Sequence, residues 1–120
     1  MDTLVIESTQ KTPYICLDAN GILEIRGSSY PENCRGFYKP VLTWIGEYSQ
    51  MPAQRTRLNI YFKYINTSTS VVVMDILNSL KKCPKTVQVI WCYDDGDEET
   101  LLTGQNFSEL LEMHFDYQAK

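Results

Sequence analysis

Residues 58–70 read LNIYFKYINTSTS, an alternating run of apolar and polar side chains that leads directly into four consecutive hydroxyl residues. Every second position from Leu58 to Tyr64 is apolar or aromatic, which is the period of a β-strand. We therefore expect a central strand over residues 58–65. The polar residues that follow, 66–70, are typical of the start of a helix.

A helix is predicted immediately downstream, because an apolar stripe recurs there at helical spacing. The stripe consists of Val73, Ile76, Leu77 and Leu80. The helix should end near Lys81 and Lys82, a basic pair that suits the negative end of the helix dipole. Alternation over residues 86–93 predicts a further strand. A third helix should span residues 98–111, and residues 113–117 alternate again as a closing edge strand.

Two antiparallel strands are predicted upstream, over residues 14–17 and 22–26. The reason is that Asn20-Gly21, which separates the two apolar runs, is a strong hairpin signal. Ser29, with a glutamate three residues later, has the spacing of a capping box and predicts that a helix opens there. The helix should end before Pro52. Its apolar face consists of Phe37, Val41, Trp44, Ile45 and Tyr48.

The predicted order of elements is strand, strand, helix, strand, helix, strand, helix, strand. Helices that alternate with strands imply a layered α/β domain, here with a mixed β-sheet of about five strands and about three helices. Crossovers between its parallel strands should be right-handed. A chain of 120 residues fits one domain spanning residues 1–120, and it can bury a core without disulfides or a metal.

The composition argues against several classes of function. The net charge is −4, and an acidic protein is a poor candidate for binding nucleic acid. No stretch approaches the roughly 20 apolar residues of a membrane span, and the N-terminus lacks signal-peptide character, so we expect a cytoplasmic protein with no membrane contact. The four cysteines form no CxxC pair and His114 is the single histidine, so no metal site is predicted.

Acidic residues concentrate near the C-terminus, where eight lie between Asp94 and Asp116 with no lysine or arginine among them. A solvated helix face explains them, and a docking surface for a basic partner is the alternative. Residues 94–99 have the composition of a calcium loop without its alternate ligand spacing. We therefore expect these acids to mark a helix N-terminus.

No catalytic constellation is recognisable, so we expect a protein that is not an enzyme and needs no cofactor. His114 lies in a predicted strand, and no serine has a GxSxG motif around it. Neither a P-loop nor GxGxxG is present to support nucleotide binding. A pocket that gathered Asp94, Asp97 and His114 around a metal would reverse this expectation.

The segment from Asn66 to Ser70 is the most informative one, because its hydroxyls sit between a strand and a helix. Helix capping alone explains such residues, at about 1 kcal/mol for a good cap. The same position also favours an anion, through the helix dipole and unpaired N–H groups. A phosphate there would add about −1.5 to −2 charges to an exposed end of the sheet and expel a partner that packs apolar or acidic surface against it.

A partner-facing surface is predicted on the same helix. If the apolar stripe faces the core, then Val71, Val72 and Asp75 lean outward or to the flank. An exposed Val72 beside Thr67 would be an apolar contact that a phosphate could spoil. The predicted partner-binding surface comprises Asn66, Thr67, Ser68, Val71, Val72 and Asp75.

Four segments are distinctive in combination. They are residues 8–13, residues 27–33 with the run SYPEN, residues 64–68 with the pattern YxNTS, and residues 91–95 with the acids that follow. Their order and spacing resemble the SiaC family of bacterial regulatory phosphoproteins along nearly the whole chain.

The resemblance implies a small α/β domain similar in layout to anti-sigma-factor antagonists, a STAS-like layout. It implies that a partner Ser/Thr protein kinase phosphorylates Thr67, the threonine of the YxNTS pattern, and that a metal-dependent Ser/Thr phosphatase reverses this. It also implies that the unphosphorylated protein binds a diguanylate cyclase and promotes cyclic di-GMP synthesis, which favours aggregation and biofilm, and that phosphorylation blocks the binding. Ser68, Thr69 and Ser70 are competing acceptors within one turn.

The chain departs from the family pattern just after the phosphosite. The family motif usually continues with serines and then a lysine, whereas Thr69 takes a serine place here and Val71 stands where the lysine is expected. Loss of that charge would weaken phosphate retention or alter contacts with the kinase and partner. The alternative function is an anti-sigma-factor-antagonist type of partner switch that acts on a different protein.

Overall fold

The computed structural model describes all 120 residues, Met1 to Lys120. Six strands form one mixed sheet whose spatial order follows the order of the chain. The first three strands pair antiparallel, and the third to the sixth run parallel to one another. The strands are β1 (Leu4–Ile6), β2 (Tyr14–Asp18), β3 (Ile22–Ser29), β4 (Arg55–Ile65), β5 (Thr86–Tyr93) and β6 (Phe115–Ala119).

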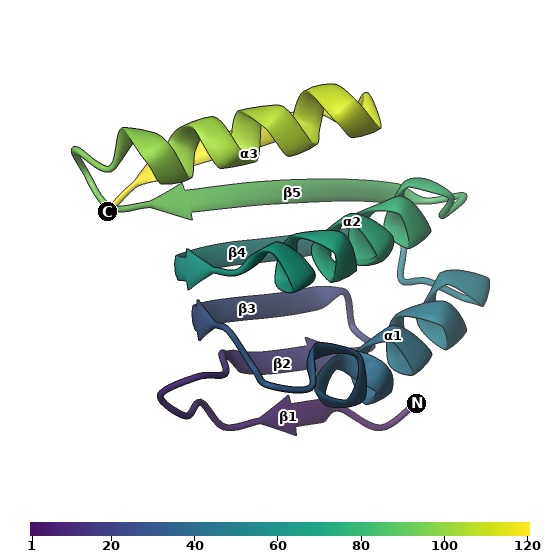
Figure 1. The fold of residues 1–120 in the computed structure, drawn as a ribbon. Coiled ribbons are helices and arrows are strands. Elements are labelled where there is room, and N and C mark those ends of the chain that lie inside the picture. Colours follow the sequence, from purple (N-terminus) through teal and green to yellow (C-terminus); the bar gives the residue numbers. More distant parts are fainter.

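Three helices connect the parallel strands, and all of them cover the same face of the sheet (Figure 1). They are α1 (Cys34–Gln50), α2 (Thr67–Lys81) and α3 (Glu98–Leu111). Each crossover steps to the next strand in the same direction along the sheet. Right-handed crossovers that all step the same way place their helices on one side. The other face of the sheet is therefore left without helices.

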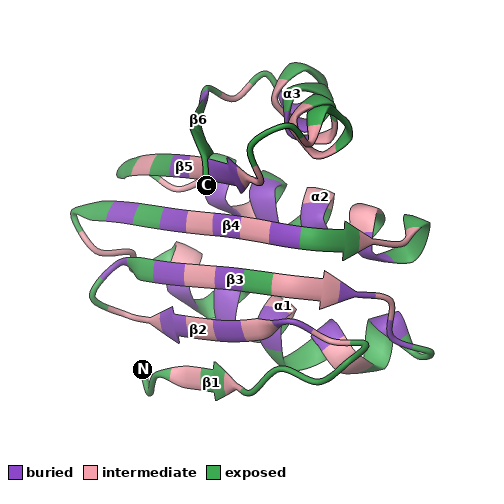
Figure 2. Ribbon diagram, turned by 90° about the vertical axis from the view of Figure 1, so that its left-hand side faces the viewer, coloured by how far each residue is buried: buried purple, intermediate pink, exposed green.

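The hydrophobic core lies between the sheet and the three helices, as the alternating buried positions along the strands in Figure 2 indicate. The predicted central strand is confirmed, since β4 lies between β3 and β5 and buries Leu58, Ile60 and Phe62. Gly104 lets α3 approach the sheet closely, because a Cβ there would lie only 2.5 Å from Cδ1 of the buried Trp91. The expected α/β architecture with a mixed sheet is thus confirmed.

Two strands differ from the expectations. The sheet has six strands rather than about five, because β1 was not predicted. It is only three residues long, too short for an alternating pattern to be recognised, and it pairs with β2 at the edge of the sheet. The central strand begins at Arg55 rather than Leu58, because the pairing of Arg55 and Thr56 with β5 extends the ladder into polar sequence.

The predicted helix start at Ser29 was wrong. β3 continues to Ser29, whose side chain is fully buried, and the real cap of α1 is Asn33, which accepts a hydrogen bond from the Gly36 N–H at 3.1 Å. Pro31 explains part of the difference, since a proline disfavours helical geometry in the residue before it. The chain therefore turns after β3 before it enters α1.

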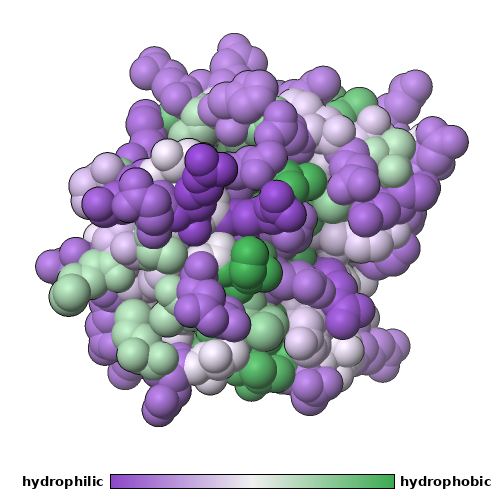
Figure 3. Space-filling model, turned by 180° about the vertical axis from the view of Figure 1, so that it is seen from behind, coloured by the Kyte–Doolittle hydropathy of each residue, from purple (hydrophilic) through white to green (hydrophobic).

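The helix-free face of the sheet is solvent-exposed and mainly hydrophilic, with a small hydrophobic group near its middle (Figure 3). Polar side chains alternate with buried ones along the central strands, as expected for a sheet with one covered face. The polar residues on this face of β3, β4 and β5 include Glu24, Arg26, Arg55, Arg57, Asn59, Tyr61, Lys63, Thr86 and Gln88.

Candidate functional site

The segment after β4 is shaped by Asn66, which caps α2. Its Oδ1 accepts a hydrogen bond from the N–H of Thr69 at 2.8 Å, and its carbonyl accepts the first helical bond from the N–H of Ser70 at 3.1 Å. The Asn66 N–H donates to the carbonyl of Ser29 at 3.0 Å, which ties the turn to the end of β3. These bonds fix the N-terminus of α2 at the carboxyl end of the sheet.

Thr67 and Ser68 occupy the first two positions of α2, and both are exposed. Neither hydroxyl is hydrogen-bonded to another protein group, and neither backbone N–H is bonded to a carbonyl. Free N–H groups at the positive end of a helix dipole favour an anion. A phosphate on either hydroxyl would therefore break no existing bond.

Thr69 and Ser70 differ from the two exposed hydroxyls. Thr69 is 0 % exposed, and its Oγ1 lies 2.8 Å from Ser29 Oγ and donates to the Ser29 carbonyl at 3.1 Å. Ser70 is half-buried, with its Oγ 3.4 Å from the carbonyl of Asn66. The structure contradicts the prediction of Thr69 as a competing acceptor, because a kinase needs an accessible hydroxyl and this one lies in the core.

A buried hydrogen-bond network of Ser29, Tyr38 and Thr69 joins the end of β3 to the beginnings of α1 and α2. The Tyr38 hydroxyl lies 2.7 Å from Ser29 Oγ. Burial raises the pKa of the Tyr38 phenol far above its ordinary value of 10.0, although the hydrogen bond with Ser29 opposes this shift. Tyr38 therefore stays protonated, and the network holds the first turn of α2 on a rigid base.

The predicted partner-facing residues of α2 are only partly exposed. Val71, one turn after Thr67, is 48 % exposed, and Asp75 is exposed as well. Val72 is 1 % exposed and belongs to the core, so the prediction that it leans outward was wrong. The reason is that α1 packs beside α2, which buries a wider arc of the helix than the sheet alone would cover.

A groove of about 330 Å³ runs between the beginnings of α1 and α2, where Arg35 lies close to Ser68 and Val71. Arg35 Nη1 is 3.4 Å from Asp75 Oδ2, and both side chains are largely exposed, so this ion pair contributes little to stability. Arg35 brings a positive charge to the neighbourhood in which the expected lysine is replaced by Val71.

The acidic residues after β5 lie at the same end of the sheet as Thr67, because neighbouring parallel strands have their carboxyl ends on the same side. Asp94 accepts hydrogen bonds from the Tyr61 hydroxyl and from Lys63 Nζ, the latter at 3.0 Å. These bonds, with that of Tyr61 first, lower the pKa of Asp94 below its ordinary value of 3.8. The same cluster raises the pKa of Lys63, and the Tyr61 hydrogen bond is again the main cause.

Asp97 is the N-cap of α3, because it accepts hydrogen bonds from the Thr100 N–H at 3.1 Å and the Thr100 hydroxyl at 2.6 Å. The Thr100 hydroxyl is also the main cause of a lowered pKa at Asp97. His114 instead pairs with Asp116, at 3.0 Å, where β6 begins at the opposite end of the sheet. Asp94, Asp97 and His114 therefore do not converge.

The fold assembles no cluster of three or more His, Cys, Asp or Glu side chains suited to a metal ion. None of the three helices combines the length and the apolar character needed to cross a membrane.

Sequence reasoning missed Ser29, Tyr38 and Arg35 as parts of this site. Ser29 continues the buried alternation of Leu23 and Ile25, so a longer strand pattern could have identified it. Arg35 and Tyr38 meet α2 only through tertiary packing of α1, for which the local pattern gives no signal.

Comparison with known proteins places the chain among regulatory phosphoproteins. A family model described as SiaC family regulatory phosphoprotein matches residues 6–120. An uncharacterized protein of Pseudomonas aeruginosa strain UCBPP-PA14 is 32% identical over 123 residues, which cover 99% of this chain and 98% of that protein. The crystal structure of apo-SiaC from Pseudomonas aeruginosa has a TM-score of 0.90 at 31% identity, and the match covers 99% of this chain and 100% of that one.

A further similar structure is the crystal structure of the diguanylate cyclase SiaD in complex with its activator SiaC, also from Pseudomonas aeruginosa. The matched chain has a TM-score of 0.91 at 31% identity, with 98% of this chain and 99% of that chain covered. Since the family model spans nearly all of the sequence and the fold agrees over the same length, the chain belongs to the SiaC family of regulatory phosphoproteins.

Proposed function

We propose that this protein is a regulator that binds and activates a diguanylate cyclase while it is unphosphorylated. The support comes from the similar SiaC chain, which is described as the activator of the cyclase SiaD and is found in complex with it. The protein acts in the cytoplasm by binding rather than by catalysis. Activation of the cyclase raises cyclic di-GMP synthesis and favours aggregation and biofilm.

Phosphorylation of Thr67 is the proposed switch. A Ser/Thr protein kinase adds the phosphate, and a metal-dependent Ser/Thr phosphatase removes it. The observation that carries this proposal is the exposed Thr67 hydroxyl, which makes no hydrogen bond within the protein and stands beside the two free N–H groups that open α2. Ser68 shares this exposure and is the competing acceptor, whereas Ser70 is half-buried.

The phosphate acts by changing the character of a contact surface. Val71, one helical turn beyond Thr67, is 48 % exposed and gives this surface an apolar contact. A phosphate on Thr67 carries about −1.5 to −2 charges and must lose hydration if a partner covers it. The carboxylates after β5 at the same edge add repulsion toward an acidic partner.

The partner-binding surface consists of the exposed and half-buried residues Asn66, Thr67, Ser68, Val71 and Asp75. Val72 supports them from the core rather than touching the partner. The alternative is a partner switch of the anti-sigma-factor-antagonist type that acts on a different protein. The observation that favours this alternative is Val71, which stands where the family pattern has a lysine and so removes a positive charge beside Thr67.

The test begins with the candidate kinase and ATP, followed by mass spectrometry to locate the phosphate. The unphosphorylated, phosphorylated, Thr67→Ala and Thr67→Asp proteins are then titrated into the purified cyclase, with binding and cyclic di-GMP synthesis as readouts. We expect Thr67→Ala to bind like the wild type and the phosphorylated protein to bind at least about tenfold more weakly. Aspartate carries less charge than phosphate, so its effect should be smaller.

Thr43→Asp on the exposed side of α1 is the matched control, since it adds the same charge away from the Thr67 surface. Equal weakening by Thr43→Asp and Thr67→Asp would contradict a local switch. Phosphate on Ser68 alone would move the switch by one residue. Phosphorylation of Thr67 without any cyclase binding by either form would favour the alternative partner.

A further inference from the structure

A second polar feature lies at the end of the sheet opposite Thr67, where β4 and β5 begin. It is a hollow of about 580 Å³ on the helix-free face, lined chiefly by Ile22, Arg55, Arg57, Thr86, Gln88 and Asp116. Strand pairing sets its layout, because Arg57 stands between Ile22 of β3 and Gln88 of β5, and Arg55 stands beside Thr86. Ile22 is its one apolar side chain.

Both arginines of this hollow lack a carboxylate partner. The chain has four arginines, of which Arg26 is paired with Glu24 and Arg35 with Asp75. Arg55 and Arg57 form neither an ion pair nor a side-chain hydrogen bond with another residue. They are two positions apart on one strand, so their side chains leave the sheet on the same face. Two guanidinium groups therefore meet in one hollow with their donors free.

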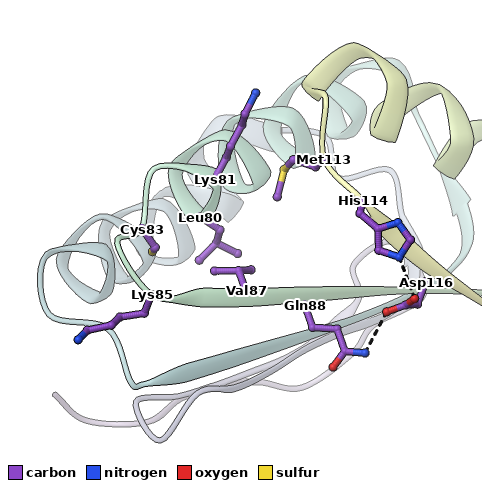
Figure 4. Close-up of a pocket in the computed structure, with 9 residues that line it drawn as sticks. All are labelled: Leu80, Lys81, Cys83, Lys85, Val87, Gln88, Met113, His114 and Asp116. Atoms are coloured by element: carbon purple, nitrogen blue, oxygen red, sulfur yellow. Dashed lines mark hydrogen bonds and ion pairs between the residues drawn. The ribbon is translucent and has the colours of Figure 1, made fainter.

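Asp116 is the acidic residue of the hollow, but other groups already use its oxygens. Gln88 Nε2 donates to Oδ2 at 2.9 Å, and His114 Nε2 lies 3.0 Å from Oδ1 (Figure 4). These two bonds, with that of Gln88 first, lower the pKa of Asp116 below its ordinary value of 3.8. Asp116 thus stays ionised and is turned toward β5 and its own strand rather than toward the arginines.

A neighbouring hollow of about 300 Å³ shares Gln88 and Asp116 and is also lined by Lys81 and Lys85 (Figure 4). Figure 4 shows both lysine side chains directed away from Asp116, and Lys81 Nζ donates a hydrogen bond to the Leu111 carbonyl. Arg55 and Arg57 therefore supply the positive charge beside Asp116. This local excess contrasts with the net charge of −4 for the whole chain. An anion that approaches this end of the molecule is attracted by the two unpaired arginines.

We propose that the hollow at Arg55 and Arg57 binds the phosphate groups of a small molecule. Guanidinium groups match phosphate oxygens with paired hydrogen bonds, and each offers five N–H donors. The Thr86 hydroxyl adds a further donor at the rim. A single carboxylate has two oxygens, too few for all of these donors, whereas two linked phosphates carry enough oxygens to pair with both arginines. The volume lies within the range of small-molecule sites, and Ile22 offers an apolar contact to whatever carries the phosphates.

The test is isothermal titration of the full chain with inorganic phosphate, pyrophosphate and a nucleoside diphosphate, at an ionic strength held constant with chloride. We expect saturable binding of pyrophosphate, weakened at least about tenfold by Arg55→Gln or by Arg57→Gln, since each removes a charged set of hydrogen bonds. Arg26→Gln is the matched control, because it removes the same charge from the same face of the sheet. It should bind pyrophosphate like the wild type.

Amide NMR shifts provide a second measurement that does not depend on the variants. Pyrophosphate should shift the amides of Thr86 and Gln88 most strongly. Shifts centred on Thr67 and Ser68 would instead assign the anion to the start of α2 and overturn the proposal, as would the absence of saturable binding or an equal loss in Arg26→Gln. Tighter binding of the nucleoside diphosphate than of pyrophosphate would show that Ile22 and its neighbours also contact the nucleoside. These outcomes are independent of the proposed switch at Thr67.

Discussion

Replacing Thr69 by valine should destabilise the protein, whereas the same replacement at Thr67 should leave its stability nearly unchanged. Valine keeps the shape and the helix propensity of threonine, so each variant changes little except the hydroxyl. At Thr69 that hydroxyl is fully buried, and its removal loses two hydrogen bonds with oxygen, to Ser29 Oγ and the Ser29 carbonyl, and a weak one with Cys34 Sγ. At Thr67 the hydroxyl is exposed and unbonded.

The magnitude follows from the two lost bonds. At about 1 kcal/mol net for each, Thr69→Val should cost about 2 kcal/mol. Ser29 keeps its bonds to Tyr38 and to the Asn66 N–H, and the further group that loses a partner is the weakly polar Cys34 thiol, 3.8 Å from Thr69 Oγ1. An unfolding entropy of about 0.25 kcal/mol/K for a chain of this length converts the loss into a Tm lower by about 8 °C.

Thermal and urea unfolding followed by circular dichroism measure both variants under identical conditions. Thr67→Val should stay within about 0.5 kcal/mol of the wild type, as exposed substitutions usually do. If Thr67→Val lowers the stability as much as Thr69→Val, the distinction between an exposed acceptor and a buried anchor fails.

Asn66 caps α2, so Asn66→Ala should lower the free energy of unfolding by about 1 kcal/mol, because Oδ1 no longer accepts the hydrogen bond from the Thr69 N–H. Asn66→Asp keeps an accepting oxygen and should keep the stability. An equal loss of stability in both variants, measured by urea unfolding, would refute the capping role. The Tyr61 hydroxyl is the main cause of the lowered pKa of Asp94, so Tyr61→Phe should move the titration midpoint of the Asp94 carboxyl, measured by ¹³C NMR, upward toward 3.8. A carboxyl whose pKa is lower in the folded than in the unfolded protein stabilises the fold at pH values above its unfolded-state pKa. This stabilisation is lost as the pH falls through the folded-state pKa. The stability difference between Tyr61→Phe and the wild type should therefore be present at pH 5 and shrink in stronger acid.

The strands and helices of the parallel half were predictable from sequence because each element carries its own apolar period. β4 alternates, and α2 repeats its stripe at Val73, Ile76 and Leu77. These periodic patterns exist because each strand and helix buries one side in the core and exposes the other. β1 escaped prediction because three residues at an edge cannot display a period.

The candidate site was predictable only where local chemistry decides it. Asn66 after a strand is a cap on grounds of sequence alone. Thr69 is buried and Thr67 exposed because Thr69 bonds to Ser29 of β3, which in turn bonds to Tyr38 of α1. The burial of Val72 depends on the packing of α1 against α2. Such contacts between residues distant in sequence leave no trace in the spacing of residues 66–72.

The rigidity of the first turn of α2 decides how a phosphate at Thr67 would act. Asn66 and the Ser29–Tyr38–Thr69 network hold this turn without any contribution from the Thr67 side chain. Phosphorylation would therefore break no bond that holds the fold. Its effect is to change the charge at this surface, and the net charge of the chain goes from −4 to about −6. The tenfold loss of affinity expected for the phosphorylated protein requires about 1.4 kcal/mol, and a shift from 99:1 bound to 1:99 bound would require about 5.5 kcal/mol. Repulsion and the desolvation of a buried phosphate must supply it, so the partner has to cover Thr67 directly rather than respond to a change of fold.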